Sequence, residues 1–431
     1  MTYEEYKKVK HAYQEYGHLF LLDRKHACLF YKPGKGKTYP AIDAIRDIND
    51  EKGGKAKVLV LSTPDAINNM WLTEIDTQNI MPEYTVYMTF NSAIVDKRKL
   101  QLLKVKWDII VIDESHKIKA HNTKISKLVF QLTKDCEYVF GLSGTPIGNN
   151  EIDIFCQFHN MHISEWGNIS YTQFVNICCE TETNYFGGKQ IIVPKKVNDK
   201  YRVGWDNNVA YFAQFIDYED DDVPKPNVEL VILPYTPTKE YLLAEDGVIS
   251  LQDYETTLTK LTAIQKCHQA ANGFLYIPDE DGNKTIHVFE VNGKLKWLKD
   301  NLTNEPTVIV YMFQADLVSL KEELTKDNIS FTDDVNLFKE GNINVLLLQC
   351  SRCESFNLQM CKKMIYYTFD YSYIKYNQML HRIYRMGQTE PVNIKVLAFD
   401  KTIELSIWKA VQNKEKLSDM FMSFKGEVLN G

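Results

Sequence analysis

Short, uninterrupted apolar runs recur along the first part of the chain, between longer stretches of mixed polarity. They cover residues 27–30, 57–62, 85–90, 107–112 and 138–142. Runs of this length, rich in β-branched residues and without polar alternation, suit strands that are buried on both faces. Because segments of helical length separate them, the pattern predicts strands alternating with helices, and therefore an α/β domain whose parallel sheet is covered on both sides.

The alternation of apolar runs with segments of helical length stops at about residue 165 and resumes later in the chain. Residues 165–225 are rich in Tyr, Asn, Gly and charge and end in an acidic, proline-bearing stretch, and residues 238–273 have a helical pattern. Buried-strand runs then return at 308–311, 344–348, 363–367 and 392–397. A chain of 431 residues is also too long for one ordinary core. We therefore predict two domains, residues 1–225 with a compact insertion at about 165–225, and residues 226–431 with a helical insertion at about 238–273.

Composition narrows the class of protein. Hydrophobic residues make up 44% of the chain and charged residues 25%, as in soluble globular proteins. No apolar run approaches the ~20 residues of a membrane span, and the N-terminus lacks the apolar centre of a secretory signal. The nine cysteines are scattered, which suits small buried residues in a reducing cytoplasm. We expect a cytoplasmic protein that does not contact a membrane.

The charge balance restricts how nucleic acid could bind. The formal net charge is −7 and the sequence pI is near 5.9, which argues against bulk electrostatic binding. A local basic stripe inside a cleft remains compatible with an acidic exterior.

A glycine-rich turn follows the first apolar run. Gly34, Lys35, Gly36, Lys37 and Thr38 stand between that run and a helical segment. Backbone N–H groups and the positive end of a helix meet an anion in such a turn. We predict an ATP site, with Lys37 on the outer phosphates and the Thr38 hydroxyl on Mg²⁺. The alternative is a basic glycine turn that merely precedes a helix.

An acidic pair, Asp113 and Glu114, directly follows the apolar run at 107–112. Ligands collect at the carboxyl ends of strands in open α/β sheets. Asp113 is the candidate Mg²⁺ carboxylate, held through water, and Glu114 is the candidate base for the hydrolytic water. The alternative is a simple helix N-cap.

Ser143, Gly144, Thr145 and Pro146 follow the next strand. By themselves they indicate only a turn. A place beside the acidic strand would let their hydroxyls sense the catalytic carboxylates.

Near the C-terminus, Gln378, Arg382 and Arg385 are spaced four and three residues apart and would share one helix face. Two arginines on one face are usually solvated. Facing a triphosphate they would be arginine fingers, which stabilise the charge that builds on the transferred phosphoryl group.

The order of these motifs, Gly-Lys-Gly-Lys-Thr, Asp-Glu-Ser-His, Ser-Gly-Thr-Pro and Gln-Met-Leu-His-Arg-Ile-Tyr-Arg-Met-Gly-Gln, is similar to that of superfamily-two nucleic-acid motors, and specifically of Swi/Snf-type ATPases. The resemblance implies two tandem RecA-like lobes, with ATP between them and duplex DNA across both. It implies Mg²⁺-ATP-driven movement on double-stranded DNA of any sequence. It also implies a monomer, with room for a recruiting protein.

The resemblance assigns further residues. It implies that Gln14 reads adenine and that His116 and Gln378 belong to the ATP site. It implies DNA contacts by small polar residues in five segments, namely Ser62 and Thr63, Thr89 and Asn91, Ser143 and Thr145, Ser351, and Asn357.

Some positions depart from the family pattern. Cys353 and Ser355 stand where the family's fifth motif has glycines. If that loop needs positive φ, each costs about 1 kcal/mol or more. The departure and the acidic net charge leave open an ATP-gated clamp with slow turnover that binds nucleic acid or a protein partner. A helicase that unwinds branched DNA or RNA is a further alternative. The insertion at 165–225 resembles that of small bacterial and phage members, so we expect a bacterial cell or a phage-infected host.

Overall fold

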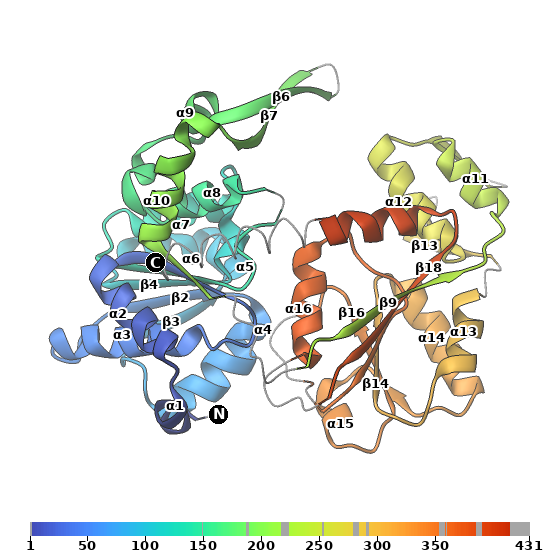
Figure 1. Cartoon of the computed structure of the whole chain (residues 1–431), viewed down its shortest axis with the longest axis horizontal. Helices are drawn as coiled ribbons and strands as arrows, with labels where there is room; N and C mark the ends of the chain where they lie inside the picture. Colours follow the sequence, from blue (N-terminus) through green and yellow to red (C-terminus); the bar gives the residue numbers. More distant parts are fainter. Residues whose placement is uncertain are drawn as a thin grey trace. The chain divides into compact units, whose positions relative to one another are not determined.

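The computed structural model describes residues 2–148, 150–186, 189–216, 224–251, 254–278, 284–289, 293–352, 358, 360–384 and 390–413. These residues form two compact units. Unit 1 contains the described residues up to 216, and unit 2 contains those from 224 onward (Figure 1). The predicted domain boundary at residue 225 stays a prediction.

Unit 1 is built on a six-stranded sheet in the order β3-β2-β4-β5-β1-β8, with every neighbouring pair parallel. The five apolar runs predicted as strands are five of these strands, and β8 was not predicted. The strands are β1 His26–Tyr31, β2 Val58–Ser62, β3 Thr85–Thr89, β4 Ile109–Asp113, β5 Tyr138–Ser143 and β8 Ala213–Ile216.

Two apolar cores cover the faces of this sheet. One face packs against α1 Tyr3–Val9, α2 Ala12–Arg24, α3 Thr38–Glu51 and the π-helix η1 Ile67–Ile75. The opposite face packs against the later helices. These later helices are α5 Phe90–Ala93, α6 Asp96–Lys104, η3 Ser115–Ile118, α7 Lys124–Thr133, α8 Ile152–Asn160, η4 Ser164–Asn168, α9 Tyr171–Cys178, η5 Asp199–Tyr201 and α10 Arg202–Phe212. The two remaining short helices are α4 Pro64–Ala66 and η2 Asp76–Gln78.

The segment with the broken rhythm contains an antiparallel hairpin. β6 Cys179–Phe186 pairs with β7 Lys189–Val197, and the hairpin projects from unit 1 beside α9 (Figure 1). Its base joins the core of unit 1 through Cys179 and Val197, whereas its other described side chains are partly or fully exposed.

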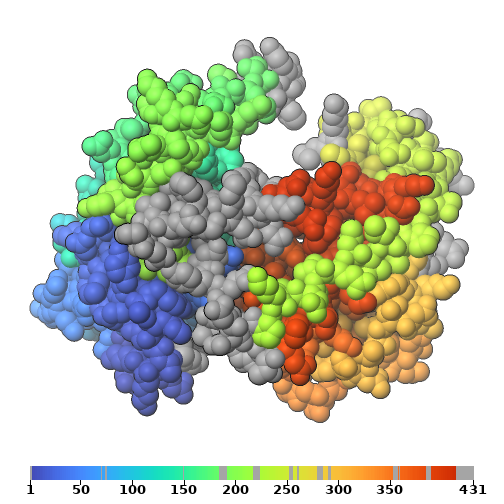
Figure 2. Space-filling model, in the orientation of Figure 1, coloured from blue at the N-terminus to red at the C-terminus, as the bar shows by residue number. Residues whose placement is uncertain are grey.

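Unit 2 has a second parallel sheet, in the order β15-β16-β14-β17-β18-β9. All four predicted strands are present, while β9 and β15 were not predicted. Figure 2 shows β9 at the surface of unit 2. The strands are β9 Asn227–Leu233, β14 Thr307–Tyr311, β15 Phe331–Thr332, β16 Val345–Gln349, β17 Lys363–Tyr366 and β18 Asn393–Phe399.

Helices again cover both faces. One face packs against α15 Val335–Lys339, α16 Tyr373–Ile383 and a helix at residues 403–413. The other packs against α11 Lys239–Glu245, α12 Lys260–Ala271, α13 Gly293–Asn301 and α14 Gln314–Lys326. The predicted architecture of tandem RecA-like lobes, each a parallel sheet between helices, is confirmed.

The helical pattern at 238–273 is only partly helical. α11 and α12 are separated by a hairpin of β10 Val248–Leu251 and β11 Tyr254–Thr257. The helix stops because Gly247 takes a φ of +79° just after its end, a conformation that glycine adopts at little cost. A second hairpin, β12 Phe274–Pro278 with β13 Lys284–Val288, follows α12. Within the described residues, no helix has both the length and the apolarity needed to cross a membrane.

Candidate nucleotide site

The glycine-rich turn joins β1 to α3, as predicted. Gly34 has a φ of +89° and Gly36 a φ of +66°, in the left-handed region that favours glycine. A Cβ on Gly36 would also lie 2.6 Å from Gln14 Nε2. Helix α3 begins at Thr38, with Lys37 as its N-cap. The turn therefore exposes the N-terminal N–H groups of α3 to an anion, with Lys37 beside them.

Helix α2 is bound to this turn. Gln14 Nε2 donates to the carbonyls of Lys35 at 3.3 Å and Gly36 at 3.5 Å, and Tyr13 OH donates to the Lys35 carbonyl at 3.2 Å. Gln14, predicted to contact adenine, is thus in direct contact with the glycine-rich turn at residues 34–38, called the phosphate turn because it is predicted to bind phosphate.

Helix α1 is fastened to α3 by a buried carboxylate. Asp43 accepts hydrogen bonds from Tyr3 OH at 2.5 Å and Tyr6 OH at 3.1 Å, and it pairs with Lys10 Nζ at 2.7 Å. Lys10 lies just before α2, so this cluster fixes the chain that carries Gln14 onto α3.

The acidic pair lies at the carboxyl end of β4, in the middle of the sheet. Asp113 is 2% exposed, and its Oδ2 accepts hydrogen bonds from Ser62 Oγ at 2.9 Å and Trp71 Nε1 at 3.0 Å. Burial raises the pKa of the Asp113 carboxyl, against the opposing effects of Lys37 and these two donors. A carboxylate that is buried in this way is stabilised further by a bound cation.

Glu114 follows in an unusual backbone conformation, with a φ of +60°. Such a conformation is costly for a non-glycine residue and is often found at functional sites. Glu114 Oε1 lies 3.6 Å from Lys37 Nζ, and Oε2 lies 3.2 Å from His116 Nδ1. The structure therefore brings together Lys37, Asp113, Glu114 and His116, four of the predicted site residues.

The turn after β5 lies between the phosphate turn and the acidic pair, because β5 is between β1 and β4 in the sheet. Ser143 Oγ lies 3.2 Å from His116 Nδ1. A Cβ on Gly144 would lie 2.9 Å from both Cγ and Cδ of Pro33. The turn thus lies beside the acidic pair and contacts His116, and its sensing of the catalytic carboxylates stays a prediction. Thr145 Oγ1 is buried and has no hydrogen-bond partner among the described residues.

The residues present fit a magnesium ion. Thr38 supplies a hydroxyl and Asp113 a carboxylate, and the Thr38 hydroxyl donates to Met70 Sδ at 3.8 Å. In the described part of the chain, no group of three or more His, Cys, Asp or Glu residues is placed to hold a metal. Mg²⁺ needs no such group, because it is usually bound through one or two carboxylates, waters and substrate phosphates.

The residues predicted to contact DNA are placed differently from one another. Ser62 and Thr63 are buried. The Ser62 hydroxyl donates a hydrogen bond to Asp113, and the Thr63 side chain caps α4. Thr89 caps α5 and Asn91 is exposed on it. Ser351 is exposed in the turn just after β16, and Asn357 lies outside the described residues. Their contacts with DNA stay predictions.

In unit 2, helix α16 carries Gln378 and Arg382 one turn apart. Gln378 is buried, whereas Arg382 is partly exposed. Arg385 lies outside the described residues, so its place on this helix face stays a prediction.

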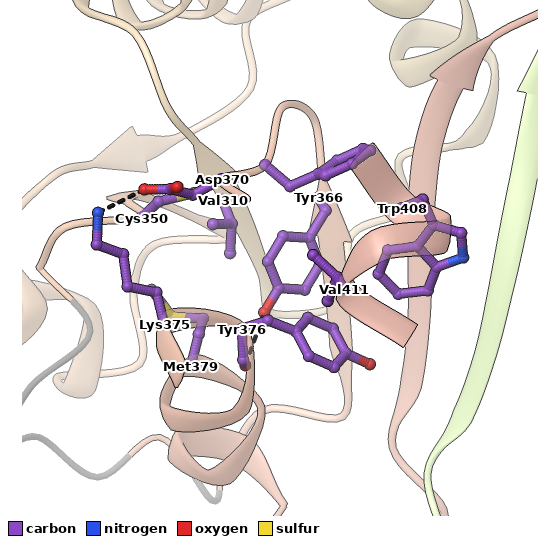
Figure 3. A pocket seen from close by; sticks show the side chains of 10 residues that line it. Val310, Cys350, Tyr366, Asp370, Lys375, Tyr376, Met379, Trp408 and Val411 are labelled. Carbon is purple, nitrogen blue, oxygen red and sulfur yellow. Dashed lines mark hydrogen bonds and ion pairs between the residues drawn. The ribbon is translucent and has the colours of Figure 1, made fainter. Parts of the chain in front are cut away.

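A small cavity lies beneath α16 (Figure 3). Its volume is about 10 Å³, room for about one water. Tyr366, which lines the cavity, donates a hydrogen bond from its OH to the backbone carbonyl of Tyr376 at 3.3 Å. Lys375 and Asp370, which also line it, form an ion pair. This cavity belongs to the core that supports α16, and it is too small for a nucleotide.

A larger groove, of about 620 Å³, lies elsewhere in unit 2. Its walls include Asn227, Thr307, Lys363 and Asn393, at the amino ends of β9, β14, β17 and β18. Ligands of open α/β sheets bind at the opposite, carboxyl ends. This groove is therefore not where the fold predicts a nucleotide.

The sequence did not predict four contacts at the candidate site: the hydrogen bonds from Trp71 and from Ser62 to Asp113, the contact of Met70 with Thr38, and the hydrogen bond from Tyr13 to the phosphate turn. For Met70 and Trp71, the available signal was their position within residues 64–75, directly after β2 at the carboxyl edge of the sheet. Nothing in the sequence indicates which side chains they meet.

Comparisons with known proteins agree with the motifs. Residues 77–185 match the SNF2-related domain family. The uncharacterized ATP-dependent helicase YqhH of Bacillus subtilis is 21% identical over 94% of this chain and 77% of its own length. The CHD3-type chromatin-remodeling factor CHR7 of Arabidopsis thaliana is 23% identical over 74% of this chain and 27% of its own length.

Two further comparisons concern a third relative and a solved structure. A Drosophila melanogaster SWI/SNF-related regulator of chromatin, subfamily A-like protein 1, is 22% identical over 89% of this chain and 52% of its own length. The chain thus spans from about a quarter to about three quarters of these three relatives. Among solved structures, the Sulfolobus solfataricus SWI2/SNF2 ATPase core in complex with dsDNA is 18% identical, with a TM-score of 0.40 over 96% of this chain and 92% of that one. The resemblance to Swi/Snf-type ATPases that was predicted from the motifs is confirmed.

Proposed function

We propose that this chain is an ATPase that hydrolyses ATP to move along double-stranded DNA, and so remodels DNA or protein–DNA complexes. One observation carries the proposal: Lys37 and the acidic pair, which are more than seventy residues apart in sequence, meet with 3.6 Å between Lys37 Nζ and Glu114 Oε1. A phosphate-binding cation beside a candidate base is the arrangement that phosphoryl transfer to water needs.

The phosphate side of the site is the β1–α3 turn. Its left-handed glycines let backbone N–H groups approach a triphosphate, and Lys37 adds a positive charge at the outer phosphates. Gln14 is fixed against the turn by two backbone carbonyls, and from there it would read the adenine edge. Catalysis in this class of reaction is largely positioning and charge stabilisation, so the rigidity of the turn matters.

The hydrolytic side is Glu114. Its carboxylate lies between Lys37 and His116, and it would orient the attacking water and accept a proton from it. Thr38 and Asp113 would hold Mg²⁺, which when bound supplies charge neutralisation at the phosphates. Ser143, in the neighbouring turn, contacts His116, which in turn contacts Glu114. A movement of that turn would therefore shift His116 and with it the position of the Glu114 carboxylate.

We further propose that Arg382 and Gln378 of unit 2 complete the ATP site, and that Arg385 joins them. The support is the motif order and the shared helix α16 for the first two. Arg382→Ala is expected to slow hydrolysis far more than it weakens ATP binding, because an arginine finger acts mainly on the transition state.

For DNA, the proposed contacts are small polar residues that hold the phosphate backbone and so carry no sequence information. Asn91 and Ser351 are exposed and are the first to test. Ser62, Thr63, Ser143 and Thr145 are buried, and they would reach DNA only after their loops move.

The test is the rate of Mg²⁺-dependent ATP hydrolysis with duplex, single-stranded and branched DNA and with RNA. The proposal expects strong stimulation by duplex DNA, loss of activity in Lys37→Ala, and displacement of a triplex-forming strand from duplex DNA. No stimulation by any nucleic acid at any salt concentration would overturn it.

A second candidate is an ATP-gated clamp with slow turnover. Two observations favour it, the net charge of −7 and the non-glycine residues Cys353 and Ser355 in the fifth motif. Duplex-stimulated hydrolysis without triplex displacement would support the clamp. Separation of forked strands would instead support an unwinding helicase.

A further inference from the structure

Two consecutive residues of η1 contact the two side chains that would hold Mg²⁺. Met70 Sδ accepts the hydroxyl proton of Thr38 at 3.8 Å, and Trp71 Nε1 donates to Asp113 Oδ2 at 3.0 Å. A hydroxyl that gives its proton to sulfur keeps its oxygen lone pairs for a cation. A nine-residue π-helix is itself uncommon, and π-helical turns occur frequently at functional sites.

The contact of Trp71 with Asp113 is closely constrained. The indole is 0% exposed, and an indole has only this one N–H to donate. Its ring packs near Tyr87, with 6.2 Å between centroids, and Tyr87 OH donates to Asp76 Oδ1 at 3.0 Å. Trp71 therefore has little freedom to turn away, and its position sets the position of Asp113 Oδ2.

A second residue, at the start of the segment that leads to Trp71, also binds Asp113 Oδ2. Ser62, the last residue of β2, donates to Asp113 Oδ2 at 2.9 Å. Thr63 then caps α4, and η1 starts at the residue after α4. Ser62 and Trp71 thus stand on either side of the segment 63–70, and both donate a hydrogen bond to the same oxygen of Asp113. A shift of this segment changes the hydrogen bonds that orient the metal-binding carboxylate.

We infer that Trp71 and Met70 are positioning residues for the Mg²⁺ site, and that they transmit to Asp113 and Thr38 the position of the segment 63–70, which begins at the proposed DNA contact Thr63. The inference rests on the proposed function. It adds a physical link in unit 1 between the DNA loop after β2 and the ATPase centre. Partners that orient metal ligands commonly affect metal affinity by about 10- to 100-fold.

The test is Trp71→Phe, which keeps an aromatic ring but removes the N–H donor together with part of the volume of the indole. Binding of a fluorescent ATP analogue is titrated with Mg²⁺, with and without duplex DNA. The expected result is that the Mg²⁺ concentration for half-maximal binding rises by roughly tenfold. The response of that concentration to DNA is expected to shrink. Met70→Leu should give a smaller shift in the same direction.

Trp107→Phe is the matched control. Trp107 is also buried in unit 1, and its Nε1 donates to the Leu102 carbonyl at 3.0 Å, away from the site. It is expected to leave the Mg²⁺ dependence unchanged. If Trp71→Phe does not fold, Ser62→Ala removes the other donor to the same oxygen and is likewise expected to raise the Mg²⁺ concentration for half-maximal binding.

The outcomes separate the two proposals. If the wild-type chain shows duplex-stimulated hydrolysis but Trp71→Phe, or Ser62→Ala in its place, matches Trp107→Phe in Mg²⁺ dependence and DNA response, this inference is overturned and the proposed function stands. If the wild-type chain binds no Mg²⁺–nucleotide complex, both are overturned.

Discussion

Lys37 Nζ lies 3.6 Å from Glu114 Oε1, so the cation expected to bind phosphate is paired with the carboxylate expected to activate water. The pair joins the turn after β1 to the end of β4, across the intervening strand β5. A triphosphate would compete with Glu114 for Lys37. Nucleotide binding would then release the Glu114 carboxylate to face a water molecule.

Lys37→Ala is the first prediction. It removes the charge at the outer phosphates and leaves Glu114 without this cation. We expect ATP hydrolysis to fall by about 100-fold or more, since a single preorganised charge-stabilising group commonly contributes that much. Lys25→Ala, whose exposed side chain pairs with Glu137 at 3.1 Å, is the control and should keep full activity. Wild-type hydrolysis in Lys37→Ala would contradict the site.

Glu114→Gln separates binding from hydrolysis. The amide keeps the shape of the side chain but cannot accept a proton from water. We expect hydrolysis to drop by roughly 100-fold or more, while ATP binds at least as tightly because Lys37 loses its competing carboxylate. Equilibrium binding and single-turnover rates measure the two effects. An equal loss of binding and rate would assign Glu114 to nucleotide binding instead.

Gly144→Ala tests the close approach of two turns. The new methyl group would lie 2.9 Å from two ring atoms of Pro33, which forces the turn after β5 away from the phosphate turn. We expect a loss of about 1–3 kcal/mol in the free energy of unfolding and reduced hydrolysis. Gly204→Ala on α10 meets no atom within 4 Å and is the matched control. Urea unfolding of both variants measures whether Gly144→Ala, and not Gly204→Ala, lowers the free energy of unfolding.

Glu404 makes the stability of unit 2 dependent on pH. Burial raises the pKa of this carboxyl, but Lys294 Nζ at 2.6 Å and the nearby His268 more than offset burial and lower its pKa to about 2. A lowered folded-state pKa stabilises the ionised form. The contribution is therefore complete above the ordinary value of ~4.3, and it is lost as the pH falls toward about 2.

The measurement is the free energy of unfolding between pH 2 and pH 7 for the wild type and Glu404→Gln. The difference between them should be roughly 3 kcal/mol or more near neutral pH, since the variant leaves Lys294 buried without its partner, and it should shrink at low pH. Glu229→Gln removes an exposed pair with Lys395 and should change stability by less than about 1 kcal/mol. A difference that does not vary with pH would contradict the assignment.

The sequence by itself determined the strands that form the cores and the residues with obvious chemistry. Apolar runs such as 107–112 predict buried strands because such runs cannot face water on either side. Lys37, Asp113 and Glu114 were predictable because a turn after a buried strand fixes which edge of the sheet they occupy. β8 and β9 escaped prediction because they are short or lie at sheet edges, where the apolar pattern is weak.

The tertiary structure alone decided which side chains meet. That Ser62 bonds to Asp113 depends on β2 lying next to β4, and strand order is not encoded in any local pattern. The place of Trp71 depends on the π-helical winding of η1, because each hydrogen-bonded turn of a π-helix contains one residue more than a turn of α-helix and so changes the direction of the side chains that follow. Local periodicity therefore predicts the layers of this protein, whereas the long-range packing of those layers produces its site.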